Sequence, residues 1–156
     1  MTFIEILVKL RRIVRSINLE SKRVDKELGV SIPQLLCLQF LAEQADFSTN
    51  ASKLKGFLNL NASTITGIIS RLEKKKLVVK LPKSTDKRIT LISLTSKGME
   101  LIQGAPITFQ QKLSEKLQAL PSDKLKIVIE GIEILTELMK VDILDDSTII
   151  TKKEAL

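Results

Sequence analysis

The first 28 residues carry more apolar side chains than one face of a helix can hold. Apolar residues recur at alternating steps of four and three residues, a spacing typical of one side of a long helix. This row consists of Phe3, Leu7, Leu10, Val14, Ile17, Val24 and Leu28, with Ser21 in the same row. Near the N-terminus it is widened by Ile4, Ile6, Val8 and Ile13. Such a helix must be covered on more than one side.

A final helix over residues 123–139, after a break at Pro121 and Ser122, has the same property. One of its rows holds Leu125, Val128, Ile132, Leu135 and Met139, and another holds Ile127, Ile134, Leu138 and Val141. A monomer would leave this surface in water, whereas an isologous homodimer would bury it. We expect an interface that includes Phe3, Leu7, Leu10, Val14, Leu125, Ile132, Leu135 and Met139. The alternative is that both helices are covered within one subunit.

The region after the first helix begins with clear helix-end signals. Gly29 favours the left-handed conformation that closes a helix. Ser31 and Gln34 form a capping-box pattern for a second helix that runs to about Gln44.

Two further helices are separated by only a short turn. The third covers about residues 51–58, with Thr49 or Asn50 as its cap, and the fourth covers about residues 61–76. This arrangement predicts a helix-turn-helix.

The fourth helix has one apolar side and one side of short polar residues at 100° per residue. Its core side holds Ile65, Ile68, Ile69 and Leu72. The opposite side carries Ser63, Thr66, Gly67, Ser70 and Lys74, with Arg71 at its edge. Small hydrogen-bonding side chains allow close approach to base edges in a major groove. We expect base contacts from Ser63, Thr64, Thr66, Gly67 and Ser70; an ordinary solvent-exposed face is the alternative.

A β-hairpin is predicted directly after this helix. Leu77–Leu81 and Ile89–Leu94 are rich in β-branched residues, and the turn-like sequence PKSTDKR joins them. Its tip carries Lys83, Lys87 and Arg88. A hairpin in this position is a wing.

The rest of the chain is predicted to be helical with one interruption. Thr95 is the expected N-cap of a fifth helix, which Gly104 and Pro106 interrupt before it resumes near Phe109. Residues 146–156 lack periodicity, so we expect a mobile tail.

The positive charge of the chain is concentrated in its middle. The formal net charge is +7, yet residues 51–90 hold ten basic and two acidic side chains, a local charge of +8. A solvated lysine-rich face is possible, but the pattern also fits an electrostatic footprint for a polyanion. We expect phosphate contacts from Lys53, Lys55, Arg71, Lys74 and Lys75, joined by Lys83 and Lys87 on the wing.

Composition argues against catalysis. The chain has no His, so it has no imidazole general base and no His-ligated zinc. Its single cysteine, Cys37, cannot form an internal disulfide, and we interpret it as buried structural sulfur, with redox sensing as the alternative. A cation site on Glu130, Glu133 and Glu137 is less favoured than a solvated acidic face. We expect no catalytic residues, metal or cofactor.

The composition also indicates the cellular compartment of the protein. Cysteine usage fits a reducing cytoplasm, and no segment approaches the roughly 20 uninterrupted apolar residues that a membrane span needs. We therefore expect a cytoplasmic protein with no membrane partner.

Several segments together resemble the MarR (multiple antibiotic resistance regulator) family of winged-helix transcription factors. They are STITGIISRLEKKKLV from Ser63, DKR at Asp86–Arg88 and LTSKG at Leu94–Gly98. The resemblance implies that terminal helices pair two subunits and that the helix before the wing enters the major groove. It also implies that Arg88 reaches the minor groove, with Asp86 as its orienting partner.

The sequence departs from the family pattern at two places. Lys76 stands where glycine is common, so a left-handed cap would cost about 1 kcal/mol more or be replaced by another turn. In the third helix, Lys55 stands where a small residue is usual, and Gly56 is a poor helix former that could instead allow a close approach.

The resulting prediction is a mainly α protein with a small β-hairpin wing. A winged helix-turn-helix over residues 31–95 is flanked by dimerisation helices in 1–30 and 96–145. We expect a homodimeric, sequence-specific regulator of a pseudo-palindromic DNA operator, most simply a repressor. The resemblance permits release by a small anionic or aromatic effector. A protein-interaction winged helix and a nonspecific nucleoid-type DNA binder are the alternatives.

Overall fold

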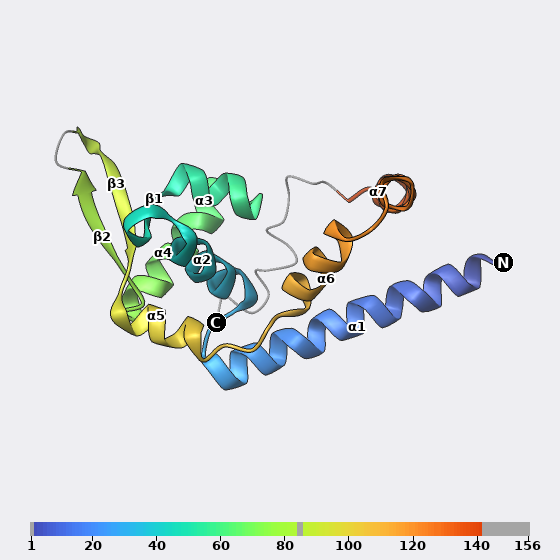
Figure 1. Cartoon of the computed structure of the whole chain (residues 1–156), viewed down its shortest axis with the longest axis horizontal. Helices are drawn as coiled ribbons and strands as arrows, with labels where there is room; N and C mark the ends of the chain where they lie inside the picture. The colour runs from blue at the N-terminus through green and yellow to red at the C-terminus, as the bar shows by residue number, and fades with distance from the viewer. Residues whose placement is uncertain (1, 84–85, 142–156) are drawn as a thin grey trace.

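The computed structural model describes residues 2–83 and 86–141, and for Lys83 and Asp86–Arg88 it describes the backbone alone. A long helix, α1 (Phe3–Leu28), extends well beyond the body formed by the elements that follow it (Figure 1). Gly29 ends this helix with φ 69° and ψ 20°, as predicted. The tail expected over residues 146–156 lies outside the described residues.

The predicted helix-turn-helix is present. Helix α2 (Ile32–Glu43) begins with the expected capping box between Ser31 and Gln34. Helices α3 (Ala51–Leu58) and α4 (Ala62–Lys74) begin at Asn50 and Asn61, whose side chains accept from the backbone N–H groups three residues later. These caps are local, so a single sequence contains the information for them.

Lys76 adopts the left-handed conformation that the family usually gives to glycine. Its φ is 60°, and the chain closes α4 with hydrogen bonds from Lys76 N to Glu73 O at 2.9 Å and from Leu77 N to Leu72 O at 3.0 Å. This bonding pattern is a Schellman motif. The usual turn is therefore kept, at the cost of placing a side chain at positive φ.

Three antiparallel strands form a small sheet in the order β1-β3-β2. Strands β2 (Val78–Lys83) and β3 (Asp86–Leu94) make the predicted wing, but both continue further toward its tip than predicted. The expected turn over 82–88 was too long, because Pro82 lies in an edge strand, where its missing N–H group is tolerated.

Strand β1 (Ser48–Asn50) and the preceding 3₁₀ turn, Ala45–Phe47, were not predicted. This three-residue strand pairs with the opposite edge of β3, Ser48 facing Ser93 and Asn50 facing Leu91. The segment between α2 and α3 is therefore hydrogen-bonded to β3 of the wing.

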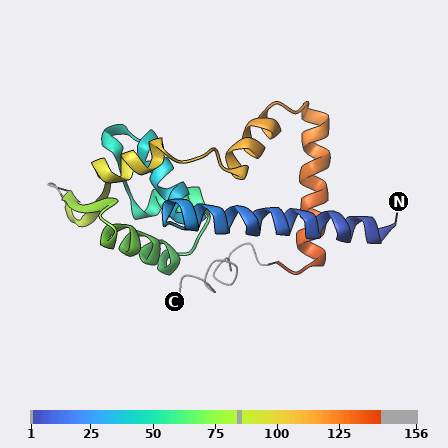
Figure 2. The ribbon, with the colours of Figure 1, turned by 90° about the horizontal axis from the view of Figure 1, so that it is seen from below.

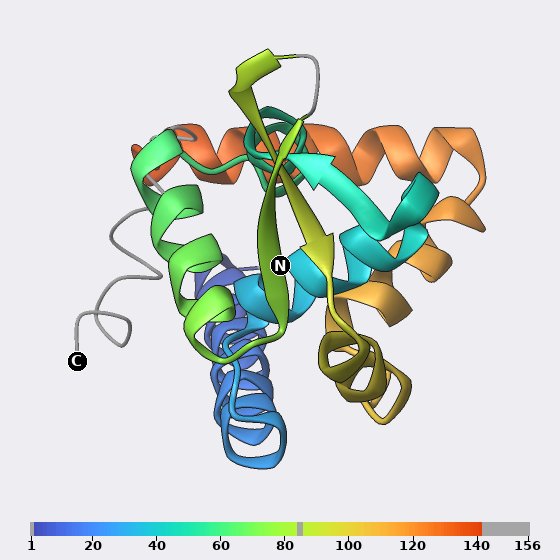
Figure 3. The ribbon, with the colours of Figure 1, turned by 90° about the vertical axis from the view of Figure 1, so that its left-hand side faces the viewer.

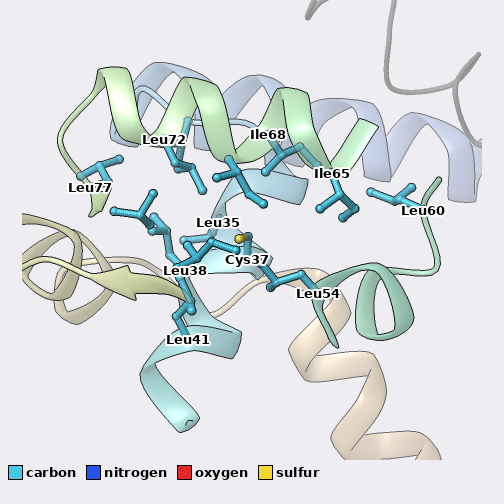
Figure 4. Packing of buried hydrophobic residues seen from close by; sticks show 14 of the residues in the cluster. Leu35, Cys37, Leu38, Leu41, Leu54, Leu60, Ile65, Ile68, Leu72 and Leu77 are labelled. Carbon is cyan, nitrogen blue, oxygen red and sulfur yellow. The ribbon is translucent and has the colours of Figure 1, made fainter. Parts of the chain in front are cut away.

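The core lies between α2, α4 and the sheet. The buried residues of α4 are Ile65, Ile68, Ile69 and Leu72, as predicted from the helical spacing. They pack against the buried side of α2, and Leu54 of α3 and Leu77 belong to the same cluster (Figure 4). This arrangement leaves the other side of α4 turned outward.

The remaining helices lead away from this core. Helix α5 (Ser96–Gln103) begins at Thr95, whose side chain accepts from Gly98 N, and the chain breaks at Gly104 as predicted. Helices α6 (Phe109–Gln118) and α7 (Ser122–Leu138) follow, and α7 runs crosswise to α1 (Figures 1 and 2).

The terminal helices expose their apolar rows in this single chain. Within α1 only Val24 is buried, and α7 has no buried residue. Phe3 is 73% exposed and Met139 is 62% exposed, and Val14 and Ile132 are each more than half exposed. The described residues of one subunit therefore do not cover both helices, against the alternative raised by the sequence. No helix in the described part of the chain is long and apolar enough to cross a membrane.

Candidate nucleic-acid interface

The outward side of α4 presents short polar side chains. Ser63 and Thr66 are exposed, and Thr64, Gly67 and Ser70 are half-buried. The apolar side chains on the opposite side are buried, so the orientation of the helix about its own axis is set by the core. The outward side therefore has the character that the sequence predicted for it.

Two hydroxyl groups on this surface are already oriented by their own helix. Ser63 Oγ donates to Asn61 Oδ1 at 2.8 Å, and Thr66 Oγ1 donates to Ala62 O at 2.9 Å. A hydroxyl group that donates its proton internally keeps acceptor capacity. Ser63 and Thr66 can therefore accept from an exocyclic amino group of a base, and Thr66 can also offer its methyl group to a thymine.

Arg71 lies against Gly67, one turn away on the same helix. A Cβ added to Gly67 would lie 3.4 Å from Arg71 Nη1, so the absence of a side chain leaves room for the guanidinium group. Arg71 is half-buried and has interactions within the protein. Gly67 thus lets a long cation lie close to the helix surface.

The predicted phosphate-contacting lysines of α3 and the end of α4 are all exposed, but one of them also has partners within the protein. The exposed residues are Lys53, Lys55, Lys74 and Lys75. Lys75 is engaged within the protein, because its ammonium group donates to Gly29 O at 2.6 Å and to Gln34 Oε1 at 3.2 Å. The contact with Gly29 and Gln34 was missed by the sequence interpretation, since nothing local links residues that are 46 and 41 positions apart.

The wing lies beside this helix. The end of β2, the start of β3, α3 and the beginning of α4 are on the same side of the molecule, at the top of Figure 3. Lys80 Nζ of β2 is 4.0 Å from Glu73 Oε1 of α4, a half-exposed ion pair between the two elements. Asp86 pairs with Lys83 in the strand register. The side chains of Lys83, Asp86, Lys87 and Arg88 lie outside the described part of the structure.

One expected close approach is absent. A Cβ added to Gly56 in α3 would meet no atom within 4 Å, so Gly56 does not mediate tight packing there. The tight contact is at Gly98 in α5 instead, where an added Cβ would lie 2.4 Å from Leu77 O. Gly98 belongs to the LTSKG segment, but nothing in the sequence showed that it abuts the end of α4.

Known proteins resemble this chain in sequence. Residues 30–90 match the model of the MarR family. YsmB of Bacillus subtilis (strain 168), an uncharacterized helix-turn-helix (HTH) type transcriptional regulator, is 27% identical over 84% of this chain and 88% of its own length. The chain is thus similar to the MarR family over the segment that holds α2, α3, α4 and β2. The relative YsmB is named as a transcriptional regulator.

Two solved structures share the fold at low sequence identity. Sco3205, a MarR family regulator from Streptomyces coelicolor in complex with DNA, has a TM-score of 0.64 and 22% identity, with 93% of each chain covered. MepR of S. aureus, also in a DNA complex, has a TM-score of 0.64 and 16% identity, covering 88% of this chain and 98% of MepR.

Cys37 is fully buried in the core of the winged helix (Figure 4). Burial raises the pKa of its thiol from 9.0 to about 12. The reactive thiolate is therefore scarce at neutral pH, which supports a structural role for the sulfur. Among the described residues there is no group of three or more His, Cys, Asp or Glu side chains that could hold a metal ion.

Proposed function

We propose that this protein is a MarR-type regulator that forms a homodimer, binds a pseudo-palindromic DNA duplex sequence-specifically and acts as a repressor. The observation that carries this proposal is the outward side of α4, which combines short hydroxyl side chains with a buried apolar side that fixes its orientation. It lies in the segment of the chain with a net charge of +8. We assign base contacts to Ser63, Thr64, Thr66, Gly67 and Ser70.

The proposed phosphate contacts surround this surface. Lys53, Lys55 and Lys74 are exposed, and Arg71 lies at the edge of the outward side of α4. On the wing, Arg88 enters the minor groove with Asp86 as its orienting partner, while Lys83 and Lys87 contact phosphates. A narrow minor groove concentrates negative potential and attracts a guanidinium group.

The proposed homodimer uses the exposed apolar rows of α1 and α7. An open groove of about 530 Å³ runs along α1 and is lined partly by the predicted interface residues Leu7, Leu10 and Val14. A helix of a second copy would fill it. In the dimer, two copies of α4 would lie about 34 Å apart, one turn of DNA. We assign this role to residues 1–30 and 96–145, and DNA binding to residues 31–95.

We also propose that a small effector regulates DNA binding through the arrangement of the two subunits in the dimer. A small anionic or aromatic effector lowers DNA affinity if it binds better to a dimer whose α4 helices are wrongly spaced. The repressor role requires only that the occupied operator overlap a promoter.

The test begins with selection of a duplex from a random pool by the purified protein. If about six phosphates are neutralised per dimer, log K falls with log salt with a slope near −5. Arg88→Glu should weaken binding to the selected duplex severalfold. Unchanged binding would contradict the wing assignment, and equal affinity for selected and random duplexes would indicate a nonspecific binder. A protein-interaction winged helix would bind neither duplex.

A further inference from the structure

Lys75 joins the end of α4 to the corner between α1 and α2. Its Nζ is 2.6 Å from the carbonyl oxygen of Gly29, the residue that ends α1. The same ammonium group is 3.2 Å from Oε1 of Gln34, a buried residue in the first turn of α2. That oxygen also accepts from Ser31 N at 3.3 Å. One cation therefore bridges three helices.

The last carbonyl groups of this region are held from the other side by α5. Lys97 Nζ donates to Lys75 O at 3.1 Å, and Thr95 Oγ1 donates to Lys76 O at 2.8 Å. Lys76 is the residue with φ 60° that turns the chain from α4 into the wing. Cations near the carbonyl end of a helix are also favoured by its dipole.

These hydrogen bonds constrain the angle between helices that otherwise contact each other through apolar side chains. The core packs α4 against α2, and packing of apolar side chains favours a crossing angle only to within about 15–20°. Hydrogen bonds also depend on angle. Lys75 acts between α4 and α1, and Lys97 acts between α4 and α5.

We propose that Lys75 and Lys97 are positioning residues that set the angle of α4 relative to α1 and α5. In a dimer built on α1, they thereby set the spacing of the two DNA-contacting helices. We call the hydrogen bonds made by the ammonium groups of Lys75 and Lys97 the clamp. The effect of the clamp on DNA binding rests on the proposed function, but the clamp itself does not. The clamp replaces the phosphate contact predicted for Lys75, which is the C-cap residue of α4 and whose ammonium group contacts Gly29 and Gln34.

The clamp is tested without DNA by amide hydrogen exchange of the full chain. Lys75→Met should speed exchange at Ser31 and Lys76 severalfold, because both ends of the bridge loosen. Lys97→Met should speed exchange at Lys76 alone. Lys74→Met is the matched control, an exposed lysine one residue away, and should leave both amides unchanged. Unchanged exchange in Lys75→Met would overturn the proposal whether or not the protein binds DNA.

The effect on spacing is tested with two duplexes, the selected palindrome and the same sequence with one half-site randomised. Lys75→Met should weaken binding to the palindrome about fivefold, within the range carried by such networks. It should leave the affinity for the single half-site and the salt slope unchanged. Lys74→Met should weaken both duplexes and make the slope shallower by about one unit per lost contact.

The remaining outcomes separate the clamp from its rivals. Lys75→Arg keeps a donor of similar reach and should recover most of the palindrome affinity, and circular dichroism should show that all variants are folded. Equal losses on both duplexes with a shallower salt slope would identify Lys75 as a phosphate contact and overturn the proposal. If wild-type protein has no preference for the palindrome, the proposed function fails, while the exchange result still decides the clamp.

Discussion

Gly98 is the tightest of the described glycine positions. A Cβ at this residue would lie 2.4 Å from Leu77 O and 2.7 Å from Leu94 Cδ1, so the first turn of α5 needs a residue without a side chain. Gly98→Ala must push α5 away from the start of the wing. We expect a loss of about 1–3 kcal/mol in the free energy of unfolding, measured by urea denaturation.

Gly56→Ala is the matched control for this substitution. Gly56 is helical and an added Cβ would meet no atom within 4 Å, so removal of a flexible glycine should stabilise α3 by about 0.5–1 kcal/mol. The two variants thus move stability in opposite directions. If Gly98→Ala were as well tolerated as Gly56→Ala, the close approach at Leu77 would be wrong.

Residues whose partners are near in sequence were predicted well. Ser31 and Thr95, both predicted as N-caps, each accept from a backbone N–H group three residues later, so their roles are visible in a short stretch of sequence. Lys75 was predicted as a phosphate contact because its local surroundings are basic. Its partner Gly29 is 46 residues away, and only the tertiary fold brings them together.

Glu20 links two elements, α1 and α6. Its carboxylate accepts from Phe109 N at the start of α6, where a negative charge is also favoured by the helix dipole. Glu20→Ala should lower the free energy of unfolding by about 1 kcal/mol, the typical cost of a lost helix cap, as measured by urea denaturation.

Arg23→Ala provides the control, because Arg23 Nη2 is the other partner of Glu20, at 3.6 Å. Its side chain is 48% exposed, and a surface ion pair of this kind contributes less than about 1 kcal/mol. A larger loss for Arg23→Ala than for Glu20→Ala would show that the ion pair, rather than the cap, holds α6.

At the scale of elements, the sequence predicted the helices and the wing but not β1. The helices have long periodic patterns, and β2 and β3 are neighbours in sequence. Strand β1 has three residues, too few for an alternation pattern, and Ser48 pairs with a residue 45 positions later. The conformation of such a strand depends on β3, which a local pattern does not reveal. The orientations of the side chains of Asp86 and Arg88 remain predictions from the family resemblance.

The whole molecule leaves its terminal helices uncovered, which is the basis of the proposed dimer. Val14→Glu or Ile132→Glu would place a charge on a surface that the dimer must remove from water. We expect each variant to sediment as a folded monomer under conditions in which the wild type is a dimer.

Val79→Glu is the control for the dimer variants, because Val79 is also exposed but lies on β2, outside the proposed interface. This variant should remain a dimer. A wild-type protein that is monomeric at micromolar concentration would contradict the assignment of α1 and α7, and it would remove the reason for two half-sites.

Because α1 is long, a small rotation at its C-terminal end gives a large displacement at its N-terminal end. Its 26 residues span roughly 39 Å at 1.5 Å per residue, and only its final turns are anchored to the winged helix, near Val24. A rotation of about 5° at the Gly29 corner therefore displaces the first turn by roughly 3 Å. In the proposed dimer, contacts near the N-terminal ends of the two α1 helices would limit the rotation at Gly29 to a small fraction of this angle. Contacts far from the DNA-binding region would thus fix the orientation of each winged helix.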